Sequence, residues 1–157
     1  MALQTSMVLF EWDDETLAPK GAAEHTARVI GSLSEQYQEI LASMRFKELL
    51  DACQKAEKEN AGVFDEVQSA ILREAAEEQE RLSCIPPEEY RAYQELTSKS
   101  TRIWTKARKE NDFASFVPVL KKIIDYQKKF ASYRQKDGQK LYDVMLDSFE
   151  PGFTMEK

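Results

Sequence analysis

Histidine, cysteine, glycine and proline are scarce in this 157-residue sequence, and these scarcities exclude several kinds of site. One histidine, His25, and two cysteines, Cys53 and Cys84, are too few for a structural zinc site. The cysteines form neither a CxxC pair nor a disulfide framework, so we interpret them as buried or half-buried thiols in a reducing cytoplasm. The sequence also lacks His-Glu-x-x-His, a glycine-rich phosphate loop and Gly-x-Ser-x-Gly. The strongest catalytic signatures are therefore missing from this chain.

Positive charge and long apolar runs are lacking as well. The sequence has 22 basic and 28 acidic residues, a net charge of −6, which argues against nucleic acid and against an anionic membrane surface as partners. No apolar run approaches the roughly 20 residues of a membrane span. The first residues, MALQTSMVLF, have neither the basic start nor the cleavage site of a signal peptide. These absences predict a cytoplasmic protein.

Apolar residues at spacings of three and four are what the sequence has in abundance, and this spacing predicts helices. The first such helix is expected over about 22–43. The stripes are Ile30, Leu33, Tyr37, Ile40 and Met44; Phe46, Leu49, Leu50 and Cys53; Phe64, Val67, Ile71 and Ala75; Tyr90, Tyr93, Leu96, Ile103, Trp104 and Ala107; and Phe113, Phe116, Val117, Leu120, Ile123, Ile124 and Phe130. Sustained strand-like alternation is absent. The sequence therefore predicts an all-α bundle of about six or seven helices.

Helix ends are marked by proline and by capping residues. Pro86 ends a helix expected to reach about residue 83, and Pro87 suits the first turn of the next helix. Asn111 and Asp112 separate two helices, and either side chain is able to cap the second. Arg108, which lies near them in the sequence, either faces a cleft or interacts with the carboxyl end of its own helix. Both interpretations of Arg108 stay open at this stage.

The C-terminal part of the sequence contains further signals for turns. Gly138 is a plausible helix end, a short helix is expected over 141–146, and Glu150-Pro151-Gly152 predicts a turn. Thr154 followed by acidic residues is typical of a helix start, yet the sequence stops there. The chain contains neither an internal repeat nor a dividing linker. We interpret residues 1–157 as one helical domain and as a fragment of a longer chain.

The stretch LFEWDDETLAPKG gathers four acidic residues, Glu11, Asp13, Asp14 and Glu15. Carboxylates bind hard cations, but this stretch lacks the spacing and the glycine of a calcium loop. Consecutive helical residues also point in different directions. We therefore favour a helix end with a solvated acidic turn, in which Trp12 is the buried residue. Tyr90, Tyr93 and Trp104 would form either a ligand wall or part of the core, and their helical spacing favours the core.

Three segments together resemble the carboxypeptidase Taq family of metallocarboxypeptidases. They are EWDDETLAPKGAAE, RIWTKARKENDFASFVPVLKKII and LYDVMLDSFEPGFT, in the family's order and spanning nearly the whole chain. The positions that carry the resemblance are Trp12, Asp13, Thr16, Pro19 and Gly21; Trp104, Ala107, Asn111, Asp112, Phe113, Phe116, Pro118 and Leu120; and Tyr142, Asp143, Leu146, Asp147, Phe149, Glu150, Pro151, Gly152 and Thr154. Each segment alone is a weak signal, whereas three in order are specific.

The resemblance implies the N-terminal part of a larger helical enzyme that removes C-terminal amino acids from peptides. In the family, a zinc-type ion is held by two histidines of a His-Glu-x-x-His helix and a later glutamate, and it activates water. The resemblance places these residues beyond Lys157, so this fragment is expected to bind no metal and to be inactive alone. It also implies a homodimer, and contacts between this chain and the rest of its own polypeptide.

The resemblance further implies that this region forms part of the wall of the substrate groove. The candidate positions, structural or in the groove wall, are Trp12, Asp13, Pro19, Trp104, Arg108, Asn111, Asp112, Phe113, Glu150, Pro151 and Gly152. A second hypothesis is a non-enzymatic helical module that binds partner helices, because an unpaired apolar face would give the same sequence pattern.

Overall fold

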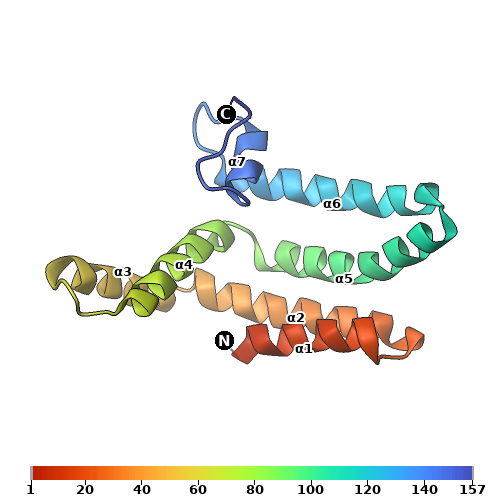
Figure 1. The fold of residues 1–157 in the computed structure, drawn as a ribbon, viewed down its shortest axis with the longest axis horizontal. Helices are drawn as coiled ribbons and strands as arrows, with labels where there is room; N and C mark the ends of the chain where they lie inside the picture. Colours follow the sequence, from red (N-terminus) through yellow and green to blue (C-terminus); the bar gives the residue numbers. More distant parts are fainter. Residues whose placement is uncertain (1, 157) are drawn as a thin grey trace.

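Helices make up most of residues 2–156, the part of the chain that the computed structural model describes, and no strand occurs in this range (Figure 1). The elements are α1 (Ala2–Thr16), the short 3-10 helix η1 (Lys20–Ala22), α2 (Ala23–Ala42), α3 (Met44–Glu59), α4 (Glu66–Ser83), α5 (Pro87–Glu110), α6 (Phe113–Arg134) and α7 (Leu141–Asp147). The predicted all-α class is confirmed, with seven α-helices in the described residues. None of these helices is long and apolar enough to cross a membrane.

Helix ends follow the capping signals in the sequence. Pro87 opens α5, and its missing N–H costs nothing at that position. Asn111 ends α5 in the left-handed conformation, with φ of 52°. Asp112 caps α6, because its side chain accepts a hydrogen bond of 3.2 Å from the backbone N–H of Ser115. The predicted separation of two helices at residues 111 and 112 is therefore confirmed.

Four long helices form a row in the order α1, α2, α5, α6 (Figure 1). Each packs on the next in the row, while α3 and α4 form a hairpin that contacts α2 and projects beyond one end. The short α7 packs against α6. A row buries less apolar surface than a closed bundle, so several predicted stripes stay open to solvent.

The largest apolar core lies where α2, α4, α5 and α6 meet. Leu41, Leu82, Ile85 and Phe130 form its buried centre, and Tyr37, Phe46, Tyr90, Tyr93 and Tyr126 pack around them. The ring of Tyr93 meets that of Phe130 edge to face at 5.3 Å. The expectation that Tyr90 and Tyr93 belong to the core is confirmed. The same expectation is wrong for Trp104, which is 44% exposed because it lies beyond this core, near the end of α5.

Gln38 of α2 binds the backbone of the link between α4 and α5. Its side chain is fully buried, and its amide nitrogen donates to the carbonyls of Leu82 (3.0 Å) and Ile85 (2.6 Å). Pro86 and Pro87 carry no N–H, so this link is short of backbone donors. The Gln38 side chain supplies donors that the two prolines lack, and this fixes the angle between α4 and α5.

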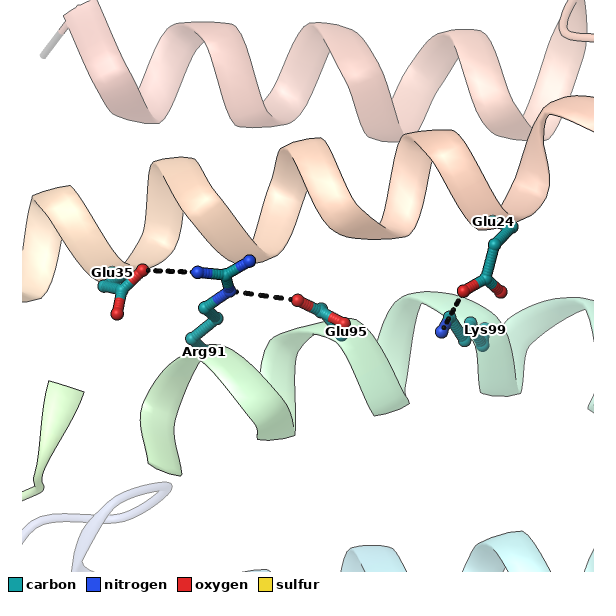
Figure 2. Close-up of polar contacts among 5 residues, drawn as sticks. All are labelled: Glu24, Glu35, Arg91, Glu95 and Lys99. Atoms are coloured by element: carbon teal, nitrogen blue, oxygen red, sulfur yellow. Dashed lines mark hydrogen bonds and ion pairs between the residues drawn. The ribbon is translucent and has the colours of Figure 1, made fainter. Parts of the chain in front are cut away.

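Polar side chains join α2 to α5 along one edge of their contact (Figure 2). Arg91 of α5 donates from Nη1 to Glu35 of α2 at 3.0 Å and from Nε to Glu95 at 3.1 Å. Lys99 donates to Glu24 at 2.9 Å. These groups are partly exposed, so each pair contributes little stability. Their role is to set the orientation of α5 along α2.

Small residues let α2 pack closely between its neighbours. Ala27, Gly31 and Ser34 are all buried on α2. A Cβ atom at Gly31 would collide with the Cγ of Glu95, so α5 could not come as close to any other residue type there. The close contact of α2 with α5 sets the position of the far end of α5, where two of the three motif segments lie.

Several expectations about burial and helix ends are wrong. Cys84 is exposed rather than half-buried, whereas Cys53 is half-buried as expected. Gly138 does not end a helix: α6 stops at Arg134, and Gly138 adopts a φ of 79° in the loop that follows. Five stripe residues are more than half exposed because the row leaves their faces uncovered: Ile40, Met44, Val67, Ile71 and Phe113.

Candidate functional site

Two of the three motif segments meet at one end of the helical row. The link from α1 through η1 to α2 and the link from α5 to α6 both lie at the end opposite the α3–α4 hairpin (Figure 1). We call this region, residues 12–22 and 102–113, the turn end. It contains eight of the eleven candidate positions, so residues about 90 apart in sequence share one part of the molecule.

An ion pair that the sequence analysis missed holds the two segments together. The guanidinium of Arg102 on α5 binds both carboxylate oxygens of Asp14 on α1, with Nε at 3.1 Å from Oδ2. Its Nη1 also donates to the backbone carbonyl of Lys20 at 2.7 Å. The Asp14 side chain is only 10% exposed, and that of Arg102 is 26% exposed. Such a shielded, bidentate pair is stronger and more directional than a surface pair.

The α5 side of the turn end combines an aromatic ring with a cation. The guanidinium carbon of Arg108 lies 5.3 Å from the centre of the Trp104 ring, within the range of a cation–π contact. Arg108 also belongs to the last turn of α5, where a positive charge is favourable. The interpretation that Arg108 interacts with the carboxyl end of its own helix fits this position, whereas Arg108 lines neither of the two hollows described in this structure, which lie between α3 and α4 and between α1, α2 and α5. Asn111 and Asp112 act as caps of α5 and α6.

The α1 side of the turn end is built around the end of α1. The carbonyl of Asp13 accepts hydrogen bonds from the backbone of Leu17 (2.9 Å) and Ala18 (2.8 Å), which ends the helix. Pro19 then precedes η1 in an extended conformation. The predicted helix end is confirmed. The predicted burial of Trp12 is wrong, because α1 contacts α2 and leaves the Trp12 ring 56% exposed.

Three large aromatic side chains stand exposed at the turn end. Trp12 and Trp104 are 56% and 44% exposed, and Phe113, the first residue of α6, is 65% exposed. Large apolar rings in contact with water usually mark a surface that binds something. Their chemistry suits apolar groups and the flat faces of peptide bonds rather than proton transfer or metal binding.

A polar hollow of about 160 Å³ lies between α1, α2 and α5 beside the Arg102–Asp14 pair. Its lining includes Glu11 and Glu15 of α1 and Thr97 and Thr101 of α5. The carboxyl group of Glu11 faces a partly desolvated place, and this burial, with the nearby charge of Glu15, raises its pKa. Glu11, Asp14 and Glu15 of α1 all line this hollow, and Asp14 in addition pairs with Arg102.

The third motif segment lies away from the turn end. It comprises α7, which packs on α6, and the turns that follow α7; Arg134 at the far end of α6 donates to Ser148 at 2.9 Å. The 22 residues of α6 place this segment about 33 Å from Phe113. Here Asp147 accepts a hydrogen bond of 2.8 Å from the backbone of Gly152, in the turn that contains Glu150 and Pro151. The structure thus does not bring these last three candidates to the turn end.

The described residues offer no place for a metal ion. Within residues 2–156, no three side chains of histidine, cysteine, aspartate or glutamate lie where they could share one ion. His25 is exposed near the start of α2. The donors that a zinc-type ion needs, such as two histidines and a carboxylate, do not fit the residues present.

The all-α fold and the three motif segments point to one family of proteins. The sequence matches the family described as carboxypeptidase Taq (M32) metallopeptidase over residues 1–157, and the chain belongs to this family. The resemblance inferred from the three segments is therefore confirmed.

Individual relatives agree with this assignment. Carboxypeptidase 1 of Bacillus subtilis is 35% identical over 151 residues, which are 96% of this chain and 29% of the relative. Thermostable carboxypeptidase 1 of Pyrococcus furiosus is 31% identical over 141 residues, which are 90% of this chain and 27% of the relative. The BsuCP crystal structure superposes on 98% of this chain with a TM-score of 0.87 and 34% identity. Trypanosoma cruzi metallocarboxypeptidase 1 does so on 99%, with a TM-score of 0.69 and 25% identity.

In each of these comparisons the match covers nearly all of this chain but only part of the relative. The chain spans about 30% of the length of each relative, whereas the relatives cover 90% or more of the chain.

Proposed function

We propose that this chain is the N-terminal helical part of a metal-dependent carboxypeptidase that releases C-terminal amino acids from peptides. The observation that carries the proposal is the family match over residues 1–157. The limited share of each relative that the chain covers supports the further proposal that the metal ligands and the catalytic base lie in another part of the polypeptide. The residues described here do not fit a zinc-type ion, so we assign them no step of the reaction.

The turn end is our candidate for a part of the substrate-groove wall. Its exposed rings, Trp12, Trp104 and Phe113, would pack on the peptide chain, and the Arg102–Asp14 pair would hold the two segments in place. Arg108, stacked on Trp104, would give this wall a positive charge. Such groups bind and orient a peptide without taking part in bond cleavage.

Two further properties belong to the proposal. The enzyme is a cytoplasmic protein, which is supported by Cys53 and Cys84 both being free thiols. It acts as a homodimer, which is supported by the apolar surface that the row of helices leaves uncovered. The family match does not favour the second hypothesis, a non-enzymatic helical module.

The activity is tested on the full-length protein with a short peptide and with the same peptide amidated at its C-terminus. We expect release of the C-terminal residue from the free peptide only, loss of activity with a chelator, and recovery with Zn²⁺ or another divalent ion. Equal cleavage of the amidated peptide, or full activity after exhaustive chelation, would contradict the proposal.

The groove wall is tested separately in the same assay. Trp104→Ala is expected to raise KM about tenfold with little change in kcat, because a wall residue binds the ground state and the transition state alike. Met44→Ala, at a residue 72% exposed on α3, is the control and should leave both constants unchanged. If the two variants behave alike, the turn end is not part of the groove.

A further inference from the structure

The side chain of Arg108 has hydrogen-bond donors that no other described residue uses. It is exposed in the last turn of α5, and its guanidinium carbon lies over the Trp104 ring, 5.3 Å from the ring centre. Within residues 2–156 this guanidinium forms neither an ion pair nor a hydrogen bond. The N–H groups of a guanidinium lie at its edge, in its plane, so contact of one face with a ring leaves them free to bind another group.

The two other arginines of α5 show what a guanidinium binds in this chain. Arg91 donates to Glu35 of α2 at 3.0 Å, and Arg102 binds both carboxylate oxygens of Asp14 on α1. Carboxylates match the planar fork of an arginine side chain, which donates to both of their oxygens. Arg108 has the same chemistry and no carboxylate partner among the described residues, so a carboxylate is the ligand that it suits.

The acidic residues of the turn end do not neutralise Arg108. Asp14 is occupied by Arg102, and Asp112 accepts a backbone N–H as the cap of α6. Glu110 lies two residues after Arg108, and helical residues at this spacing do not face each other. Among the residues that the structure describes, no acidic side chain of the turn end forms an ion pair with Arg108; these side chains are Asp13, Asp14, Glu15, Glu110 and Asp112.

Contact with Arg108, rather than overall charge, would bind a carboxylate at the turn end. The turn end has five acidic and five basic residues, so its charges balance and do not favour an anion by themselves. Trp104 and Phe113 are 44% and 65% exposed, and they place apolar surface in the same part of the molecule as the free guanidinium. An acidic group carried by a peptide suits this combination, because the rings bind the peptide chain while the guanidinium binds the carboxylate.

A peptide has carboxylates of two kinds, one at its C-terminus and others on its acidic side chains. In the proposed function the C-terminal carboxylate lies one residue, about 3.5 Å of extended chain, from the bond that is cleaved. It therefore lies close to the metal ion, and no set of metal ligands occurs within residues 2–156. An acidic side chain farther from the C-terminus is not restricted to that place, so we favour it as the ligand of Arg108.

We propose that Arg108 binds the acidic side chain of a substrate residue upstream of the one that is released. The enzyme consequently favours peptides with aspartate or glutamate at that position. This inference rests on the proposed carboxypeptidase function and names a class of substrate for its groove wall. Trp104 supports the contact, because its ring lies against the guanidinium.

The test compares short peptides that share their C-terminal residue and differ only by glutamate or glutamine at each upstream position in turn. With the full-length protein we expect kcat/KM at one position to be about fivefold higher for the glutamate peptide, as for a favourable pair at a protein surface. The difference should lie in KM, because the contact is the same in the ground state and the transition state. It should shrink as the salt concentration rises.

Variants of Arg108 test whether this residue causes the preference. Arg108→Gln should lower the ratio of the two kcat/KM values to about one, and Arg108→Glu should bring it below one. Arg108 is exposed, so both variants should fold. Lys109→Gln is the matched control, because it removes the same charge from the same turn of α5 while its side chain points in another direction. This control should keep the preference.

Isothermal titration of the metal-free, full-length protein provides a second readout, in which the peptide binds without being cleaved. We expect the dissociation constant of the glutamate peptide to be about fivefold lower than that of the glutamine peptide. The two constants should become equal in Arg108→Gln and stay different in Lys109→Gln.

Three outcomes would overturn the inference and leave the proposed carboxypeptidase function standing, since each is measured on peptides that are cleaved. The first is the absence of a preference for glutamate at every upstream position. The second is an equal loss of the preference in Arg108→Gln and Lys109→Gln, because overall charge would then explain it. The third is a variant Arg108→Gln that weakens both peptides alike, because Arg108 would then bind a group common to both, such as the C-terminal carboxylate. A protein that cleaves none of these peptides would overturn the function and the inference together.

Discussion

Removal of the Arg102 guanidinium is the sharpest perturbation of the turn end. Arg102→Met keeps much of the apolar stem but leaves Asp14, a side chain only 10% exposed, without its partner. The carbonyl of Lys20 loses its donor at the same time. Breaking a fully buried ion pair costs about 3–5 kcal/mol, and the 26% exposure of Arg102 reduces this to about 2–3 kcal/mol.

Urea denaturation of the chain measures this loss. The sequence has two tryptophans, Trp12 and Trp104, and both lie at the turn end, so their fluorescence reports on the region that Arg102 holds together. With a slope of about 2 kcal/mol/M, the midpoint should fall by about 1–1.5 M. Asp14→Leu combined with Arg102→Met should recover part of the loss, because the stranded carboxylate is then absent.

The control for this prediction is another arginine that pairs at the surface. Arg45 lies 3.8 Å from Glu48, with side chains 76% and 60% exposed, and Arg45→Met should cost less than about 0.5 kcal/mol. If Arg102→Met shifts the midpoint no more than Arg45→Met, the pair with Asp14 does not hold the turn end together, and our account of that region fails.

Two further predictions concern the core and the pH dependence of stability. Gln38→Met should lower the free energy of unfolding, measured by urea denaturation, by about 2–3 kcal/mol, because it removes the donor to the Ile85 carbonyl. Gln36→Met, at an exposed position of α2, is the control. Equal losses in the two variants would refute the role of Gln38. Folding raises the pKa of Glu11 above 4.5. The protonated carboxyl group of Glu11 therefore contributes to the stability of the fold below this pH, and this contribution is lost as the pH rises through the folded-state pKa. Glu11→Gln should therefore gain stability relative to the original chain from about pH 4 to 7, whereas a pH-independent difference would contradict the prediction.

Local signals in the sequence were sufficient to predict most of the helices and several of their ends, although the end of α6 at Arg134 was missed. The two prolines at residues 86 and 87 and the caps at Asn111 and Asp112 act over one turn of chain, so they are readable without the fold. Periodicity also identified the apolar face of α4. It did not show that Val67 and Ile71 are exposed, because a stripe indicates which side is apolar and not whether another element covers it.

Contacts between distant segments were beyond the reach of the sequence. Arg102 and Asp14 are 88 residues apart, and neither belongs to a recognisable pairing pattern. The burial of Trp12 was predicted from its apolar ring, but the open row has no element beyond α1 to cover it. The three motif segments identified the family correctly, whereas the roles of the candidate residues stay a prediction. The proximity of two of the segments, and the distance of the third, needed the packing of α2 on α5.

The contact between α2 and α5 also has a consequence for the order of folding. Glu24 meets Lys99, and Asp14 meets Arg102, so α1 and α2, which pack on each other, meet α5 only after about 100 residues have left the ribosome. At a synthesis rate of 5–20 residues per second, the faces of α1 and α2 that later contact α5 stay uncovered for roughly 4–15 s. Such non-local contacts slow folding relative to a bundle of sequential hairpins. During this interval the nascent chain is a natural substrate for chaperones.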